Sequence, residues 1–312
     1  PFYFYFLFAI QKVSLFFHIT NNDLLFKTPA ILADLGAAFF IYKIALIQEI
    51  KRPLLLMSFY LFNPAVFANS AMWGQVDGIG NFLMISAVYF LLTQNIFIVS
   101  FFLSCALLFK PLYLISVPLF VFFLWKVKKT QIIKFLILTL FFVILLSIPF
   151  VSNFFSIPNL LVSRYQSALS QYPYASVNAF NFWGGLGLNW SSDKNLFFNL
   201  TLSFWGQFIF IISSSLVLLF FLFKESTNVI KNNFTALLIL SMLFLNIFTF
   251  ATKAHERHME SVFVFLCLLI FRNKIFLLLY ILLSIIYILN LYFGIKYLSI
   301  GFVFSNSTVQ II

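Results

Sequence analysis

Charged residues are scarce in this 312-residue sequence, where Asp, Glu, Lys and Arg make up 9% of the chain. Soluble domains carry about 25%. Cysteine is also scarce, and both copies, Cys105 and Cys267, lie inside apolar runs, which excludes a secreted disulfide scaffold. Hydrophobic residues reach 63%, and the mean hydropathy is +1.05. Because a soluble fold cannot bury so much apolar surface, a cytosolic enzyme, a disordered chain and a nucleic-acid-binding module are excluded. The net charge of +11 therefore does not indicate nucleic acid as a partner.

The apolar residues form long unbroken runs rather than an alternating pattern, which excludes an outer-membrane β-barrel. Several uncharged runs are long enough for a membrane helix of about 20 residues. We expect one all-α, polytopic membrane helix bundle over residues 1–312, with about ten transmembrane helices and an N-terminal juxtamembrane helix over 2–18. The expected crossings are 28–47, 53–72, 77–93, 95–110, 111–127, 133–151, 201–223, 234–251, 258–271 and 275–294.

Basic residues divide unevenly between the two sets of loops that these crossings define. One set carries 11 Lys or Arg and the two acids Glu49 and Glu225, whereas the other carries eight Lys or Arg and six acids. The positive-inside rule places the first set in the cytoplasm. The second set includes His255, His258 and the one long polar loop, residues 152–200. We therefore expect the chemistry on the non-cytoplasmic face, and we expect the long loop to be ordered because it is rich in Tyr, Trp and Asn.

Asp77 closes a polar stretch at the outer end of the second crossing, after Trp73 and Gln75. An isolated acid there is often only a solvated helix end, and Trp73 also fits an interfacial aromatic anchor. Asp34 lies about two turns inside a crossing, where an acid is costly and usually paired or facing a cavity. It either holds a neighbouring helix or lines the site from below.

Lys110 stands between two crossings, directly before Pro111. It either snorkels to the membrane surface or binds a phosphate there. The long loop supplies another cation, Arg164, and then a set of aromatic and amide side chains that suits a carbohydrate. The alternative for this set is an interfacial aromatic belt. Its members are Tyr172, Tyr174, Asn178 and Asn181.

The densest charged cluster is Lys253-Ala254-His255-Glu256-Arg257-His258. The zinc motif His-Glu-x-x-His is absent, because position 259 is Met. His255 and His258 have a spacing that suits one helix face and a shared metal, but no third ligand is evident. We favour anion binding by the cations of this cluster, with Glu256 as the group that orients them.

Taken in order, these stretches resemble the GT-C superfamily of polytopic glycosyltransferases, which use lipid-phosphate sugars. The strongest likeness is to bacterial relatives of the mannosyl- and glucosyltransferases of the dolichol and glycosylphosphatidylinositol pathways. The matching stretches are Pro1–Tyr5, Lys27–Leu35, Asn63–Asp77, Phe109–Pro111, Tyr172–Trp183 and His255–His258. The resemblance implies an inverting hexosyltransferase that moves a hexose from a polyprenyl-phosphate donor to a lipid-linked or cell-envelope glycan acceptor.

The resemblance also places the principal catalytic Asp in a first outer loop, just before the stretch that matches Pro1–Tyr5. We therefore expect this sequence to lack the first helix, the first outer loop and that base, which leaves Asp77 as the best carboxylate present. The groups expected at the donor phosphate are Lys110, Arg164, His255 and Arg257. Those expected at the sugar or acceptor are Trp73, Gln75, Tyr172, Tyr174, Asn178, Asn181 and Glu256.

Two other classes of protein stay open at this point. One is a transporter or flippase of lipid-linked sugars, and the other is a polysaccharide polymerase or ligase. A divalent cation is the one cofactor whose requirement stays open. The sequence identifies neither the sugar nor the acceptor.

Overall fold

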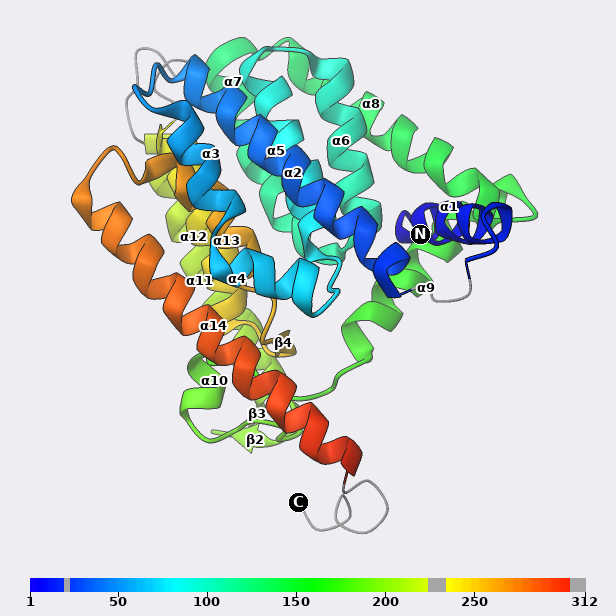
Figure 1. Cartoon of the computed structure of the whole chain (residues 1–312), viewed down its shortest axis with the longest axis vertical. Coiled ribbons are helices and arrows are strands. Elements are labelled where there is room, and N and C mark those ends of the chain that lie inside the picture. The colour runs from blue at the N-terminus through cyan, green and yellow to red at the C-terminus, as the bar shows by residue number, and fades with distance from the viewer. Residues whose placement is uncertain (20–22, 224–233, 304–312) are drawn as a thin grey trace.

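The computed structural model describes residues 1–19, 23–223 and 234–303, and these ranges are mostly helical (Figure 1). The expected helical class is confirmed. Lys224, Glu225 and Lys231, which contribute to the charge difference between the loops, lie outside the described residues. The α-helices of the described residues are α1 (Tyr3–Phe16), α2 (Asp23–Ile47), α3 (Pro53–Leu61), α4 (Pro64–Phe67), α5 (Asp77–Leu92), α6 (Ile96–Phe109), α7 (Val117–Lys128), α8 (Gln131–Ser147), α9 (Ile157–Ser170), α10 (Phe182–Gly185), α11 (Leu202–Phe223), α12 (Phe234–Phe250), α13 (Glu260–Leu266) and α14 (Lys274–Val303).

Five helices within the described ranges are long and apolar enough to cross a membrane, or six if α3 and the helical turns after it form one span bent by 42°. The five are Asp23–Ile47, Pro111–Lys128, Gln131–Phe150, Leu202–Phe220 and Lys274–Tyr297. Other apolar helices, among them α5, α6 and α12, are shorter, at 10–17 residues. Each of the ten expected crossings coincides with a helical segment, but ten full-length spans are not shown.

The turns between the central helices follow from single residues. Gln94 adopts a left-handed conformation with φ 59°, and the Asn95 side chain accepts a hydrogen bond from the Ile98 N–H at 3.3 Å. These two features end α5 and cap the start of α6, at the point where the expected crossing 77–93 gives way to the expected crossing 95–110. Because α5 and α6 run in opposite directions, the first residue of α5 and the residue after α6 lie at the same end of the bundle.

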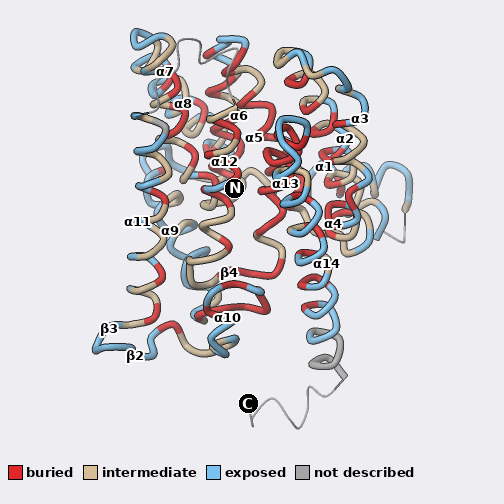
Figure 2. Tube along the Cα trace, turned by 90° about the vertical axis from the view of Figure 1, so that its left-hand side faces the viewer, coloured by how far each residue is buried: buried red, intermediate tan, exposed pale blue. Residues whose placement is uncertain are grey.

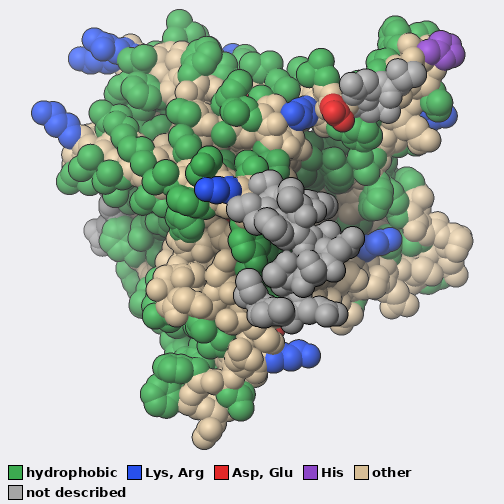
Figure 3. All heavy atoms as spheres, turned by 60° about the horizontal axis from the view of Figure 1, so that its bottom comes forward, with side chains coloured by type: hydrophobic (Ala, Val, Ile, Leu, Met, Phe, Trp, Pro, Cys, Tyr) green, Lys and Arg blue, Asp and Glu red, His purple; other side chains and the backbone are tan. Residues whose placement is uncertain are grey.

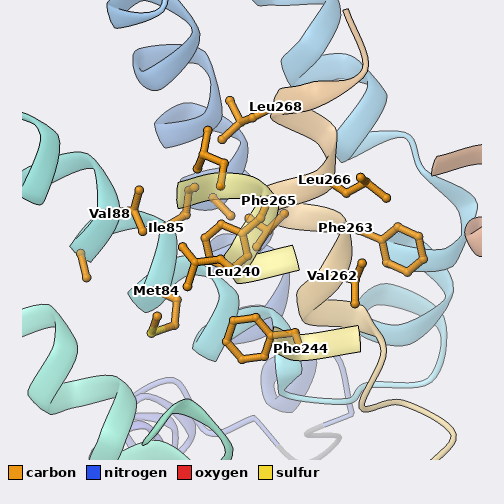
Figure 4. Packing of buried hydrophobic residues seen from close by; sticks show 14 of the residues in the cluster. Met84, Ile85, Val88, Leu240, Phe244, Val262, Phe263, Phe265, Leu266 and Leu268 are labelled. Atoms are coloured by element: carbon orange, nitrogen blue, oxygen red, sulfur yellow. The ribbon is translucent and has the colours of Figure 1, made fainter. Parts of the chain in front are cut away.

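The core lies where α5, α12 and α13 meet. Figure 4 shows Met84 and Ile85 of α5 packed against Phe244 of α12 and Phe265 of α13. The rings of Phe244 and Phe265 stack with their centroids 5.7 Å apart. Figure 2 shows buried residues concentrated along these central helices, whereas α8, α11 and α14 are largely exposed. Exposed apolar side chains on those outer helices are the surface expected to meet lipid.

Gly80 of α5 packs directly against Tyr113 in the turn after α6. A Cβ at this position would collide with the Tyr113 hydroxyl and lie 2.6 Å from Tyr113 Cε2. Tyr113 is fully buried, so its ring has no room to yield. We expect Gly80→Ala to destabilise the fold by about 1–3 kcal/mol, the usual cost of overpacking. Thermal unfolding in detergent measures this effect. Gly185→Ala is the matched control, because among the described residues nothing outside its own helix and chain neighbours lies within 4 Å of its added Cβ. An equal loss in both variants would contradict the prediction.

The long loop 152–200 is only partly loop. It contains α9, a helix that no apolar run in the sequence indicates, and the short helix α10. Two small sheets add to the expected all-α fold: β1 (Ser176–Val177) pairs in parallel with β4 (Ala254–His255), and β2 (Leu196–Phe197) pairs antiparallel with β3 (Leu200–Thr201). The strand β1 therefore fixes the long loop to the segment that carries the charged cluster. Figure 1 shows α10 and the strands β2, β3 and β4 at the lower end of the bundle, next to the lower part of α14.

Candidate functional site

The site is centred on Asp77, the first residue of α5, whose carboxylate lies at the positive end of the helix dipole. Lys110, directly after α6, donates from Nζ to Asp77 Oδ1 at 2.5 Å. The Arg257 Nε lies 3.7 Å from Asp77 Oδ2. The side chain of Asp77 is 3% exposed, whereas Lys110 and Arg257 are 22% and 24% exposed. A buried carboxylate is thus held by two cations that still reach the surface.

The charged cluster reaches Asp77 because β4 pairs with β1, with Val177 opposite His255. Lys253 anchors the same segment: its Nζ pairs with Asp193 Oδ2 at 3.2 Å and donates to the Leu169 carbonyl at 2.7 Å. Glu256 receives a hydrogen bond from Arg257 Nη1 at 3.2 Å, and this bond aims the guanidinium. The long loop and the charged segment therefore form one folded unit over the end of α5.

Tyr172 and His255 lie edge to face in this unit, with ring centroids 4.4 Å apart. Burial, helped by the positive charges of Arg257 and Lys110, lowers the pKa of His255 from 6.5 to about 3, and Asp77 opposes the shift only in part. His255 is therefore neutral at physiological pH and can serve as a hydrogen-bond donor, not as a cation. Burial also raises the pKa of the neighbouring Glu256 carboxyl, and the positive charge of Arg257 acts against that shift.

The lowered pKa of His255 makes stability depend on pH. Between pH 6.5 and about 3 the unfolded chain binds a proton at His255 that the folded chain does not, so acid favours unfolding in this window. From pH 7.5 to 5 we expect a loss of up to about 2 kcal/mol, at about 1.4 kcal/mol per pH unit below the ordinary pKa. Unfolding midpoints measured over this range should fall less for His255→Gln than for the wild type. His18→Gln, at an exposed histidine, is the control, and equal slopes in the wild type and His255→Gln would refute this account.

Beneath Asp77 lies a buried polar layer, of which only Asp34 is among the predicted site residues. Glu260, the first residue of α13, is fully buried and accepts a hydrogen bond from Asn69 Nδ2. Asp34 of α2 is 5% exposed and lies against Gly78, where a Cβ would overlap its carboxylate. Neither acid has a Lys or Arg within ion-pair distance among the described residues. The signal available in the sequence is an acid inside an expected crossing, which applies to Asp34 in 28–47 and equally to Glu260 in 258–271.

Two predicted sugar ligands serve the long loop itself. Asn178 has φ 56°, and its side-chain oxygen accepts from Trp190 Nε1 at 2.8 Å. Asn181 caps α10 by accepting from the Gly184 N–H at 2.9 Å. The position of both side chains is thus explained by backbone and loop structure. Tyr174 packs against Trp190, with ring centroids 5.0 Å apart.

The remaining predicted residues lie around the rim. Trp73 and Gln75 are half-buried in the turn directly before Asp77. Arg164 is exposed on α9, and no ion pair joins it to Asp77 among the described residues. The helix that carries it is fixed near the end of α6, because the Tyr165 hydroxyl donates to the Leu107 carbonyl at 2.9 Å. The structure therefore brings Lys110, Arg257 and His255 together around Asp77, but it leaves Arg164 outside the ion-paired centre.

A divalent cation does not fit the donor set around Asp77, because Lys110 and Arg257 already engage its two oxygens. No group of three or more His, Cys, Asp or Glu side chains within 1–19, 23–223 and 234–303 is arranged to hold a metal ion. Figure 3 looks onto the lower end of Figure 1 and shows, outside its grey atoms, separate basic side chains among hydrophobic ones and little acidic surface. Asp77 and Glu256 fit this view, since each is 2% exposed.

The sequence matches no protein-family model and no curated protein sequence. What the fold defines is a mostly helical chain with several long apolar helices, compatible with a multi-pass membrane protein.

Proposed function

We propose that the protein transfers a hexose from a polyprenyl-phosphate sugar to a lipid-linked or cell-envelope glycan on the non-cytoplasmic face of a membrane. The observation that carries the proposal is the buried carboxylate of Asp77 between Lys110 and Arg257, at one end of a bundle of apolar helices. Sugar transfer from a lipid phosphate needs these two kinds of group, a carboxylate for the acceptor and cations for the departing phosphate. The ordered set of stretches resembling GT-C enzymes supports the same class.

The reaction is a single displacement with inversion at the anomeric carbon. The acceptor oxygen forms a bond to this carbon, the bond from the carbon to the phosphate oxygen breaks, and the acceptor proton passes to a carboxylate. In the structure Asp77 Oδ2 is buried, and among the described residues no hydrogen bond reaches it. We propose that the donor phosphate draws Lys110 and Arg257 from Asp77 and thereby exposes this oxygen. His255, as a neutral donor, adds a hydrogen bond to the phosphate.

Membrane placement supports the proposed side. With α5 and α6 as two short crossings, the charge pattern gives ten crossings and puts Asp77 away from the basic loops. A polyprenyl-phosphate donor approaches such a site laterally through the lipid. Tyr172, beside His255, is proposed to contact the sugar ring with its aromatic face.

The test is transfer by purified full-length protein in liposomes that contain a labelled polyprenyl-phosphate hexose and lipid-linked acceptors. Formation of a new glycosidic bond, detected by mass spectrometry, is the expected result. Absence of any product over a panel of hexoses and acceptors, with folded protein, would refute the proposal.

One observation favours a transporter as the second candidate. Transporter sites lie near the bilayer midplane and use intramembrane acids, and Asp34 and Glu260 are buried acids without a basic ion-pair partner in the described ranges. In the same liposomes, movement of the labelled lipid between leaflets without a new glycosidic bond would identify transport. Loss of that movement in Glu260→Gln would assign it to the buried acids.

A further inference from the structure

The opposite end of the bundle carries a basic hollow that the proposed sugar-transfer site does not use. Its volume is about 410 Å³, and it lies between the connection from α2 to α3 and the residues before α14. Lys51, Arg52 and Arg272 line it together with one acid, Glu49. None of the three cations has a carboxylate within ion-pair distance in the described part of the chain. This hollow, called the basic pocket below, therefore offers an excess of positive charge to an anion.

An apolar groove runs from the basic pocket along α3 and α14. Its volume is about 450 Å³, and nearly all of its lining is apolar. The groove lies between α3 and α14. Figure 1 shows α3 and the first half of α14 on its left-hand side. Its walls include Leu55, Phe59 and Phe62 from α3 and the turn after it, and Ile281, Ile285 and Ile288 from α14.

The basic pocket and the apolar groove adjoin. Phe59 lines the groove and Phe271 lines the pocket, and their rings meet edge to face with centroids 6.1 Å apart. The Tyr280 hydroxyl donates to the Phe59 carbonyl at 3.0 Å and ties the two helices at this point. The guanidinium of Arg272 lies over the Phe234 ring, 5.8 Å from its centroid, which helps to fix its position. Within the described ranges no ion pair engages its N–H donors, which suit an anion.

We propose that this surface binds one phospholipid with an anionic headgroup, whose phosphate lies in the basic pocket and whose acyl chain lies in the apolar groove. Arg52 and Leu55 are less than one helical turn apart, so one molecule reaches both features. Charge complementarity selects the anionic headgroup, and the apolar groove selects an acyl chain. The bound leaflet is the one beside the basic loops, the cytoplasmic leaflet by the positive-inside rule.

A free phosphate shares the headgroup chemistry but leaves the groove empty. The groove is the feature that separates the two ligands, because inorganic phosphate gains nothing from Phe62 or Ile285. General attraction of basic loops to an anionic membrane is the other competing explanation. It depends on the number of charges at this end, not on their place beside the groove.

Delipidated full-length protein in detergent is titrated with phosphatidylglycerol and with phosphatidylcholine of the same chains, and bound lipid is counted by native mass spectrometry. We expect one phosphatidylglycerol to bind at least about tenfold more tightly than phosphatidylcholine, given three cations at the headgroup. Inorganic phosphate and glycerol 3-phosphate, tested as ligands in thermal shifts, should stabilise the protein much less. These measurements need only the wild-type protein. Equal affinities for the two lipids would overturn the proposal, and so would equal stabilisation by inorganic phosphate and by phosphatidylglycerol.

Variants of the basic pocket and of the apolar groove, with one matched control, test where the lipid binds. The triple variant Lys51→Ala, Arg52→Ala, Arg272→Ala should lose the preference for phosphatidylglycerol. The matched control Lys126→Ala, Lys128→Ala, Lys129→Ala removes the same charge from α7 and the turn after it, and it should keep the preference. Ser58→Phe fills the apolar groove without changing the charge. It should weaken the binding of long-chain phosphatidylglycerol and leave the binding of glycerol 3-phosphate unchanged. Equal losses in both triple variants would show only general attraction to the membrane and would overturn the assigned site.

Discussion

Asp77→Asn is expected to lower the rate of sugar transfer by about 100- to 10,000-fold, the usual contribution of a general base, while donor binding is kept or becomes tighter. The amide has the size of the carboxylate but takes no proton. It also releases Lys110 and Arg257, which the carboxylate holds at 2.5 and 3.7 Å, for the donor phosphate. Loss of turnover with an unchanged or lower KM for the donor is therefore the signature of the proposed mechanism.

The measurement is a steady-state titration of the polyprenyl-phosphate donor with wild type and variant in the same liposomes. Asp193→Asn is the matched control, because Asp193 is also a buried acid paired with a lysine, with its Oδ2 3.2 Å from Lys253 Nζ. It should keep kcat near the wild-type value, since it lies outside the ion-paired centre. Full turnover in Asp77→Asn would remove this residue from the chemistry. A raised donor KM with unchanged kcat would make it only a positioning group for the cations.

Much of the arrangement of the site follows from the sequence because charges in a membrane chain gather at helix ends. Asp77 and Lys110 flank α5 and α6, two antiparallel helices separated by a polar turn, so their meeting at one end is a consequence of helix length and direction. Hydrophobic periodicity in the sequence does not predict that Arg257 lies beside Asp77. That position depends on pairing between β1 and β4, two-residue strands too short to give a pattern in the sequence.

The sequence was least informative where polar residues serve the chain itself. Asn178 and Asn181 stay predicted sugar ligands, but their side-chain oxygens also accept hydrogen bonds from Trp190 and from a helix terminus in the same loop. A polar loop gives no sign of which amides its own backbone requires. The helix α9 was missed for a related reason, because a polar exposed stretch lacks the apolar run on which membrane helices are predicted.

Lys110→Met is expected to destabilise the folded protein by about 2–3 kcal/mol, because it leaves the buried carboxylate of Asp77 with Arg257 alone. Removing one partner of a buried ion pair usually costs about 3–5 kcal/mol, and the remaining guanidinium limits the loss. Unfolding by sodium dodecyl sulfate in mixed micelles measures the difference. Lys194→Met, at an exposed lysine of the long loop, is the control and should change little.

The double variant Lys110→Met, Asp77→Asn separates lost charge pairing from lost packing. Asp77→Asn alone should cost about 1 kcal/mol, since the two cations it releases are partly exposed and can turn to water. If the ion pair is the cause, the double variant should be no less stable than Lys110→Met, which corresponds to a coupling free energy of at least about 1 kcal/mol. Additive losses would mean that Lys110 stabilises the fold through its aliphatic stem and not through Asp77. The cations would then be free of the carboxylate in the resting protein, and donor binding would have no ion pair to open.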